Sequence, residues 1–384
     1  MFAKGVDFQG KSNFNFRDSV FCRITFFIFL TALPLWTEIF AGNPVQTSSL
    51  TLNPIYAVQE DKGILRLISI SANSGKSTLL YTGPLEKGIP VFRKNQMILF
   101  QTPSELTLLN LLNGQKSILP GSKDAFPGNS GFFRDRPWLV YSRKSGSNTA
   151  RWETVLFDYE KESELKVLPG NQPFISPDQK NIYLIGNEVK YSEHGEPSLR
   201  VPIHKFSIDT QETSTLAWIE TESTTERIQV TDVYGINDDY VVVRVSSEKE
   251  NRYHFLPSTK GELVSLQQSF FPSKKKSDLP KEQFNLSVSH DGKFIAFSER
   301  TEGKLGYVVV VDLRNRQRYE SSFIGSFPVF RNGFVYFLAD PEIVRASKET
   351  ANKLYNSFTL YELDFRKDKI RTIANLSGKA ELLE

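Results

Sequence analysis

Few side chains in this sequence stand at the spacings that catalysis or metal binding requires. The histidines of the chain are His194, His204, His254 and His290. No two of them form the H-x-x-x-H or H-E-x-x-H pattern that places two metal ligands on one helical face. The adjacent carboxylates Asp238 and Asp239 lie between two β-rich runs, where a solvated turn is more typical than a proton-transfer pair. The sequence therefore predicts no metal site and no catalytic residue.

Two short motifs resemble nucleotide and hydrolase signatures but lack essential positions. Residues 74–78 (SGKST) look like the end of a phosphate-binding loop, yet Ile70 stands where the first glycine is required and a β-rich run follows in place of a helix. Residues 128–132 (GNSGF) come nearest to the G-x-S-x-G nucleophile elbow, and Phe132 takes the place of its last glycine. We therefore expect a hairpin turn at residues 74–78, no cofactor and a non-enzymatic protein.

Charge and cysteine content exclude further classes. The chain has 384 residues with 47 basic and 44 acidic side chains, a net charge of +3. No long basic stripe is present, so nucleic acid is not an expected partner. The only cysteine, Cys22, cannot form an intrachain disulfide. The lysines at residues 274–276 could attract anionic lipid or acidic glycans, although nearby acidic residues make a solvated loop the simpler interpretation.

The N-terminal region has the pattern of a secretory signal. Residues 24–36 are an almost unbroken apolar run of 13 residues preceded by Lys and Arg. A membrane span needs about 20 residues, whereas a signal core is shorter. We expect a signal peptide or anchor over residues 1–41, with a possible cleavage after Ala41, and a soluble domain over residues 42–384. A buried N-terminus is the remaining alternative. The expected location is the periplasm or cell envelope, with no membrane span beyond a possible N-terminal anchor.

A hairpin pattern repeats through the rest of the chain and decides the fold prediction. Two apolar β-rich runs flank a short polar turn in several segments, namely residues 89–100, 132–141, 173–184, 233–243, 286–297 and 327–337. A second hairpin follows most of them, and equivalent positions recur roughly every 50 residues. Each repeat corresponds to one four-stranded antiparallel unit. The chain begins with what looks like a second strand at residues 53–59, and residues 378–384 supply one extra strand at the end.

These repeats predict an all-β fold, a seven-bladed β-propeller of four-stranded antiparallel blades. Docking of the C-terminal strand into the first blade would close the ring and remove exposed sheet edges. One helix is expected, over residues 341–355, because Asp340 and Pro341 form a good helix start. It lies between two strands of one blade and reads as an insertion.

Two of the turns carry a family resemblance. Ser176-Pro177-Asp178 and residues 289–293 (SHDGK), each followed by a strand, resemble the S-P-D-G-K-x-I-A-F signature of TolB-type WD-like propeller repeats. Gln179 replaces the glycine in one turn and His290 replaces the proline in the other. The resemblance implies a propeller fold. It does not extend to the α/β domain that precedes the propeller in TolB.

Insertion lengths point to a binding face. In a propeller the loops between the second and third strands, and the connections between blades, lie at one end of the sheets. The long insertions fall in this class, at residues 143–151, 186–199, 246–252, 271–282, 298–306 and 340–356. Insertions of this kind often mark the binding side of a repeat protein. The candidate partner-binding residues are Arg143, Lys144, Lys274 and Lys275.

The expected function is a monomeric protein-interaction or scaffold module that binds an unidentified protein partner through these loops. The alternative is a carbohydrate-binding or hydrolytic propeller whose site lies in the central channel. Two or more carboxylates converging in an aromatic-lined channel would favour the alternative.

Overall fold

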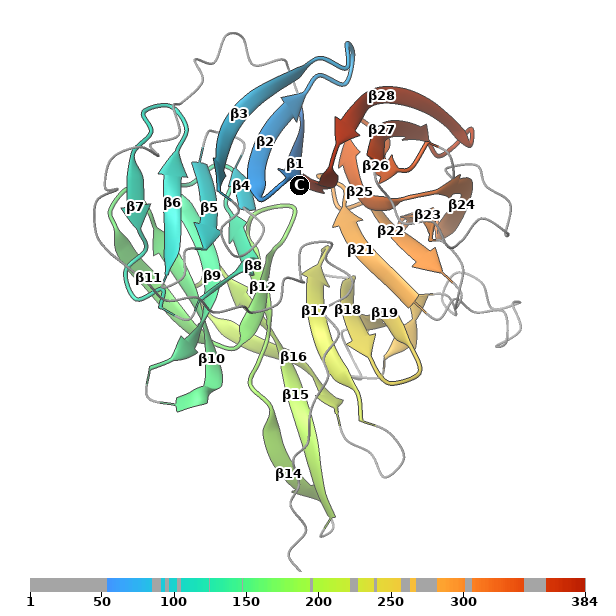
Figure 1. Cartoon of the computed structure of the whole chain (residues 1–384). Helices are drawn as coiled ribbons and strands as arrows, with labels where there is room; N and C mark the ends of the chain where they lie inside the picture. Colours follow the sequence, from blue (N-terminus) through green and yellow to red (C-terminus); the bar gives the residue numbers. More distant parts are fainter. Residues whose placement is uncertain are drawn as a thin grey trace, which may run out of the picture. The chain divides into compact units, whose positions relative to one another are not determined.

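The computed structural model of this protein describes thirteen stretches of the chain. They are residues 54–84, 91–93, 97–101, 105–123, 125–146, 148–193, 196–221, 227–237, 240–256, 263–266, 282–300, 306–341 and 357–383. All of them fall within Glu38–Glu384, which clusters as one unit. Every element with defined bounds in these stretches is a β-strand (Figure 1). The expected all-β class is confirmed.

The strands form sheets in which most sequence neighbours pair antiparallel. The first sheet has the order β29-β1-β2-β3, with β1 (Ile55–Asp61), β2 (Ile64–Ile70), β3 (Ser77–Pro84) and β29 (Lys379–Leu383). The second contains β4 (Val91–Arg93), β5 (Met97–Gln101), β6 (Leu106–Asn110) and β7 (Lys116–Ile118). The third contains β8 (Phe126–Phe132), β9 (Trp138–Ser145), β10 (Asn148–Asp158) and β11 (Ser163–Pro169).

The remaining sheets follow the same plan. The fourth contains β12 (Asn171–Ile175), β13 (Asn181–Ile185), β14 (Val189–Glu193), β15 (Glu196–Ser207) and β16 (Thr213–Glu220). An eight-stranded sheet contains β17 (Gln229–Gly235), β18 (Val241–Ser246), β19 (Asn251–Leu256), β20 (Val264–Ser265), β21 (Glu282–Val288), β22 (Phe294–Arg300), β23 (Tyr307–Asp312) and β24 (Gln317–Ile324). The last contains β25 (Ser326–Arg331), β26 (Phe334–Ala339), β27 (Ser357–Asp364) and β28 (Lys369–Ser377).

The eight-stranded sheet consists of two halves. Among the described residues, the only strand pairing between the halves is a parallel one of β19 with β21 at a single position, Asn251 with Glu282. On either side of that point, β17–β20 and β21–β24 are antiparallel meanders of their own. We therefore name the two halves separately, as the β17–β20 sheet and the β21–β24 sheet.

Turn chemistry explains why the predicted hairpins form. Lys62-Gly63 between β1 and β2 and Asn332-Gly333 between β25 and β26 are two-residue turns in which both residues have positive φ, between 50° and 81°. This conformation matches the twist of the flanking strands. At the outer hairpins, Asn110 and Asp158 accept hydrogen bonds from the backbone N–H groups of the turn that follows them. The hairpins expected from the repeats are confirmed.

Buried apolar clusters pack the described sheets face to face in series. The series runs from β4–β7 to β8–β11, to β12–β16, to β17–β20, to β21–β24, to β25–β28 and to β29 with β1–β3. Strand β23 shows why both faces must be apolar. Val309 and Val311 pack on β17–β20, whereas Val308 and Val310 pack on β25–β28, because successive side chains point to opposite faces.

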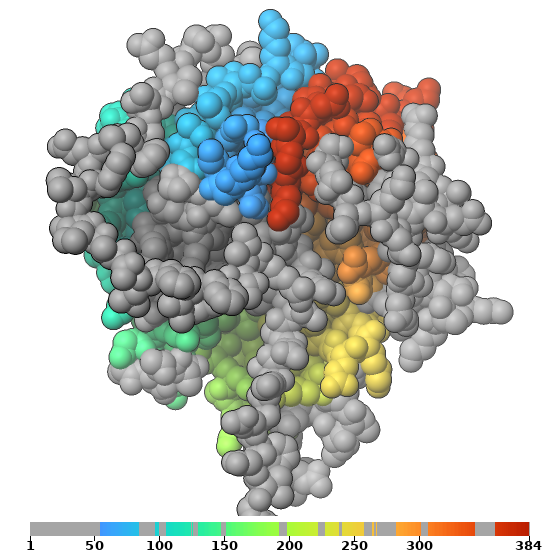
Figure 2. All heavy atoms as spheres, in the orientation of Figure 1, coloured from blue at the N-terminus to red at the C-terminus, as the bar shows by residue number. Residues whose placement is uncertain are grey.

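The C-terminal strand joins the first sheet, as the sequence predicts. Strand β29 pairs antiparallel with β1 from Tyr56–Leu383 to Glu60–Lys379. Figure 1 places the C-terminus beside β1, and Figure 2 shows the atoms of β29 against those of the first sheet. Ala380 and Leu382 of β29 are buried in the cluster shared with β25–β28. Strands from the two ends of the described chain thus complete one sheet.

Some predicted loops are strands. Residues 143–151 belong mainly to β9 and β10, and residues 186–199 include β14 and the first part of β15, which pair as a hairpin. Residues 246–252 contain a tight turn, closed by a hydrogen bond from Ser247 N–H to the Glu250 carbonyl (2.8 Å). The loop prediction was wrong over residues 143–151 and 186–199, because β-rich hairpin extensions have the polar composition of loops, and it agrees with the turn within residues 246–252.

Several predictions concern residues outside the described part of the chain. These are the N-terminal segment over residues 1–41, the helix expected over residues 341–355 beyond Pro341, and the lysines Lys274 and Lys275. In the stretches that the structure covers, no helix is long and apolar enough to cross a membrane.

Candidate functional site

A pocket of about 650 Å³ lies where the first strands of several sheets end. Its walls come from residues 54, 56, 130–134, 173–175, 177, 179, 287–291, 294, 330–333 and 365–366. They lie at the ends of the first strands β8, β12, β21 and β25 and in the turns that follow these strands, together with residues from the start of β1, the start of β22 and the β27–β28 turn. We call this side of the sheets the turn end. The opposite side, where the second strands turn into the third, is called the loop end.

The pocket includes a cluster of aromatic rings. Phe294 contacts Phe365 and Phe330, with ring centroids 5.5 Å and 6.3 Å apart. Phe330 and Phe365 are buried in the core between β21–β24 and β25–β28. The guanidinium of Arg366 lies 4.5 Å from the Phe365 centroid and 5.4 Å from that of Phe294. This part of the site presents apolar surface next to a cation.

Two turns at the pocket are fixed by their own side chains. The Ser289 hydroxyl donates to the Asp291 carboxylate (2.8 Å) and accepts from the backbone N–H groups of Lys293 and Phe294 (3.1 and 2.9 Å). Ser176 and Asp178 make the same contact (2.5 Å) in the β12–β13 turn. The Ser and Asp of the repeat signature therefore shape these turns.

Gln179, which replaces a glycine of the signature, connects two sheets. It adopts a φ of 63°, the conformation in which glycine is common. Its side-chain oxygen accepts a hydrogen bond from the Arg134 N–H (2.7 Å), and its amide donates to the Ser176 carbonyl (3.2 Å). The Arg134 guanidinium donates to the carbonyl of Pro177. These contacts fix Arg134 at the wall of the pocket.

Arginines set the electrostatics of the site. Arg134, Arg331 and Arg366 all line the pocket. Burial lowers the pKa of Arg134 and nearby Arg331 lowers it further, while Asp135 and Asp178 act in the opposite direction. Burial also raises the pKa of the Tyr56 phenol, an effect that Arg331 reduces. Arg331 is thus close enough to both groups to influence their ionisation.

Asp291 is the one carboxylate among the described lining residues. Burial alone would raise its pKa, but hydrogen bonds from Lys293 and Ser289 outweigh burial and lower it. Lys293 lies 2.8 Å from the carboxylate. Asp291 is therefore ionised at neutral pH, and the positive charge of Lys293 balances its negative charge.

A buried hydroxyl also lines the pocket. Ser287 is 3% exposed, and its Oγ has no hydrogen-bond partner within the described stretches. Buried hydroxyls are normally hydrogen-bonded, and one left alone costs free energy. Ser287 can therefore donate to a bound polar group.

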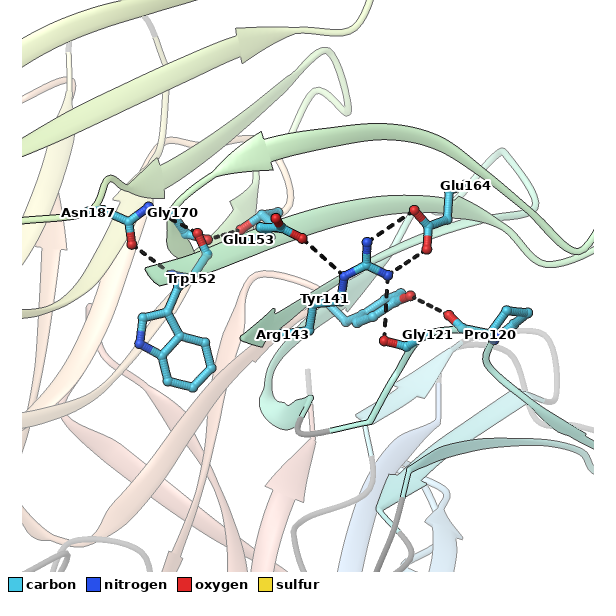
Figure 3. A network of polar contacts seen from close by, with 10 residues as sticks. Pro120, Gly121, Tyr141, Arg143, Trp152, Glu153, Glu164, Gly170 and Asn187 are labelled. Atoms are coloured by element: carbon cyan, nitrogen blue, oxygen red, sulfur yellow. Dashed lines mark hydrogen bonds and ion pairs between the residues drawn. The ribbon is translucent and has the colours of Figure 1, made fainter. Parts of the chain in front are cut away.

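The predicted binding residue Arg143 lies in a network of internal contacts (Figure 3). Its guanidinium contacts Glu164 (2.5 and 3.2 Å), Glu153 (3.3 Å) and the Gly121 carbonyl (3.5 Å). The side chain is 16% exposed. Arg143 thus connects β9, β10 and β11.

Lys144 is exposed near the loop end and lies 5.8 Å from the Trp152 ring centroid. Lys274 and Lys275 fall outside the described residues. Of the predicted binding residues, the structure describes only Arg143 and Lys144, which are adjacent in β9, so partner binding through this set stays a prediction. Among the described residues, no group of His, Cys, Asp and Glu could hold a metal ion.

Sequence reasoning did not identify the pocket residues, although a signal was present. A Phe-Arg dipeptide recurs at residues 92–93, 133–134, 330–331 and 365–366. Three of these arginines line the pocket. The Phe-Arg dipeptide is typical of a strand that ends in a turn, so its arginine by itself predicts no binding site.

Solved β-propeller structures resemble this chain. The β-propeller domain of the Trilobed protease from Pyrococcus furiosus is 11% identical, with a TM-score of 0.50 over 84% of this chain and 98% of that one. An oligogalacturonate lyase in complex with manganese is 10% identical, with a TM-score of 0.51 over 84% and 85%. TolB from Acinetobacter baumannii is 16% identical, with a TM-score of 0.42 over 85% and 80%.

No family model matches the sequence, and no curated protein does. At these sequence identities the structural matches show the fold alone. The β-propeller fold expected from the repeats is confirmed by the matches with TM-scores of 0.50 and 0.51.

Proposed function

We propose that this TolB-like β-propeller is a non-enzymatic binding protein that holds part of a partner protein in the pocket at the turn end. The observation that carries the proposal is the pocket itself. Sheets far apart in sequence contribute an aromatic cluster and three arginines to one concavity. Concave sites that combine apolar surface with a few placed polar groups are typical of ligand binding.

The proposal includes a closed, seven-bladed ring. The two halves of the eight-stranded sheet count as two blades because, among the described residues, their strands pair at a single position. Six buried clusters then pack the resulting sheets in series. One further packing, between the β1–β3 sheet and the β4–β7 sheet, would complete the ring. Pairing of β29 with β1 supports this closure.

The lining chemistry favours binding over hydrolysis. Glycoside hydrolysis commonly uses two carboxyl groups on either side of the bond that is cleaved. Asp291 is the single carboxylate among the described lining residues, and Lys293 neutralises it. Ser289, His290 and Asp291 are consecutive, but the Ser289 hydroxyl is committed to the turn. These features support a site that holds its ligand without reacting with it.

We further propose export to the periplasm or cell envelope as a monomer. The support is the apolar run at residues 24–36 with its preceding basic residues. A fusion of residues 1–41 to a reporter enzyme that is active only outside the cytoplasm tests this. Reporter activity is expected, and its absence would contradict export.

Site-specific photo-crosslinking in the native cell tests the proposed binding site. A photoreactive residue is placed at His290 or Phe174 in the pocket, at Lys144 near the loop end, and at the exposed Leu112 as a control. Crosslinks to one partner are expected from the two pocket positions. Crosslinks from Lys144 alone would return the site to the loop end predicted from sequence, and equal labelling from Leu112 would indicate nonspecific contact.

A carbohydrate ligand, bound or hydrolysed in the same pocket, is the second candidate. The aromatic cluster favours it, because aromatic faces provide flat apolar surface to a bound ligand. Incubation with neutral and acidic oligosaccharides, followed by measurement of binding and of chain cleavage, tests this candidate. Cleavage by the wild type that is lost in Asp291→Asn would replace the non-enzymatic proposal.

A further inference from the structure

The pocket carries an excess of positive charge. Its described lining contains three arginines, whereas its carboxylate, Asp291, is paired with Lys293. Asp135 and Asp178 act on Arg134 from nearby. Hydrogen bonds from Ser176 and the Lys180 N–H do not cancel the charge of Asp178, so the three arginines exceed Asp135 and Asp178 by one positive charge. The balance at the site favours an anion.

Two of the arginines reach the pocket from different sheets. Arg134 lies in the β8–β9 turn, and Arg331 is the last residue of β25, next to the β25–β26 turn. The Arg331 guanidinium donates to the Phe330 carbonyl (2.9 Å), and Arg134 is fixed through Gln179 and Pro177. Guanidinium groups present several donors in a planar fork that fits carboxylate and phosphate oxygens. Their placement suits one anionic group.

Hydroxyl groups accompany the two arginines. Tyr56, whose phenol pKa is raised further above neutral pH by burial, lines the same pocket. The Ser287 Oγ has no partner within the described stretches. The Ser287 hydroxyl can donate to an anion. The rings of Phe294, Phe330 and Phe365 offer an apolar surface beside these donors.

We infer that the pocket recognises a carboxylate or phosphate group attached to an apolar body, with the anion held by Arg134 and Arg331 and the apolar part against the phenylalanine cluster. This inference rests on the pocket of the proposed function and names the chemistry of its ligand. On a partner protein, the group would be an acidic side chain, a terminal carboxylate or a phosphorylated residue next to an aromatic or aliphatic one.

Calorimetric titration with paired probes tests the inference. Benzoate and benzamide share their ring and differ in charge. Benzoate is expected to bind at least tenfold more tightly, and this preference should fall with added salt because ions screen the attraction. Phenyl phosphate distinguishes a phosphate site from a carboxylate site. Equal binding of benzoate and benzamide by the wild type would overturn the inference without any variant.

Matched variants locate the anion. Arg331→Gln is expected to weaken benzoate binding about tenfold or more, because charge-assisted bidentate hydrogen bonds are among the stronger ones. Arg331→Lys keeps the charge and should retain part of the affinity. Arg314→Gln changes an exposed arginine of the β23–β24 turn and should have no effect. Equal losses in the Arg331→Gln and Arg314→Gln proteins would overturn the assignment, as would no loss in either.

Peptide probes separate this inference from the proposed function. Capped Phe-Glu and Phe-Gln dipeptides test whether a side-chain carboxylate is preferred. A partner captured through the pocket that binds Arg331→Gln as well as wild type would overturn the anion inference and leave the proposed function standing. Benzoate binding that depends on Arg331, together with no crosslinked partner protein, would support the anion site and overturn the proposed function in partner binding.

Discussion

Gly75 shows how a single residue carries a contact between two sheets. It closes the β2–β3 turn, where its N–H donates to the Ser71 carbonyl (2.8 Å), and its φ is +67°. A Cβ at this position would lie 2.1 Å from the carbonyl oxygen of Ile373 in β28. The motif that resembles a phosphate-binding loop is therefore a hairpin turn, as predicted, and its glycine permits the close approach of the two sheets.

Gly75→Ala is expected to lower the free energy of unfolding by about 2–3 kcal/mol, because a strained φ and a backbone clash combine. The matched control is Gly63→Ala, where φ is +79° and no atom lies within 4 Å of the added Cβ. It should cost about 1 kcal/mol from the backbone conformation alone. Urea denaturation measures both, and equal losses would refute the role of the Ile373 contact.

Glu362 provides a pH-dependent contribution to stability. Its carboxylate contacts Arg371 (3.0 and 2.9 Å) and accepts a hydrogen bond from the Tyr336 phenol (2.5 Å). Burial alone would raise the pKa of Glu362, but these contacts outweigh it and lower the pKa below 4.5. The stabilisation of the folded state by the ionised Glu362 carboxylate is therefore fully present above pH 4.5 and is lost as the pH falls through the folded-state pKa.

The Glu362→Gln protein should be less stable than wild type at pH 7. The difference between their free energies of unfolding should become smaller as the pH falls below 4.5. Unfolding free energies measured by urea titration between pH 3 and pH 7 test this. A difference in the free energy of unfolding that stays constant over this pH interval would show that the charge of Glu362 does not contribute to stability.

At the scale of elements, a polar network holds the β8–β11 sheet at its edge. Arg143 of β9 contacts Glu153 of β10, Glu164 of β11 and the carbonyl of Gly121 in the connection from β7 (Figure 3). Tyr141 donates to the Pro120 carbonyl in the same connection (3.2 Å). Reversing the charge of Arg143 would place a third carboxylate beside two others, so such a variant reports on folding as well as on binding.

Arg143→Gln is expected to lower the free energy of unfolding by about 1–3 kcal/mol, because two half-buried carboxylates lose a charged partner. Lys144→Gln, at the next and exposed position, should change it by less than about 0.5 kcal/mol. Thermal and chemical denaturation of both proteins measure the effect. Equal stability of the two variants would contradict the structural role of Arg143, and would restore it as a candidate for partner binding.

At the scale of the whole molecule, one short strand joins the two ends of the described chain. Leu382 of β29 is 7% exposed and packs in the cluster shared by the first sheet and β25–β28. If β29 closes a ring, loss of this packing weakens the association of the first and last blades as well as a local contact.

Leu382→Ala is expected to cost about 2–5 kcal/mol, the usual range for a buried leucine. The control Leu112→Ala removes a side chain that is 60% exposed and should have an effect below about 0.5 kcal/mol. Urea denaturation compares the two. A small effect at Leu382 would show that β29 contributes little to the fold, which contradicts the proposed closure.

The sequence by itself determined the strands, their hairpins and the extra strand at the C-terminus. These features depend on local physics, since alternating apolar residues and turn residues such as Lys62-Gly63 and Asn332-Gly333 act over a few positions. The same reasoning missed the hairpin β14–β15, because an extended hairpin and a loop have similar polar composition.

Only the tertiary structure decided where the pocket lies and which arginines line it. Arg134, Arg331 and Arg366 are separated by many residues, and they meet because the packing of the sheets places the β8–β9 turn, the end of β25 and the β27–β28 turn at one pocket. The same packing assigned Arg143 to an internal network. A side chain's neighbours across sheets depend on the sum of all these packings, which no local pattern in the chain encodes.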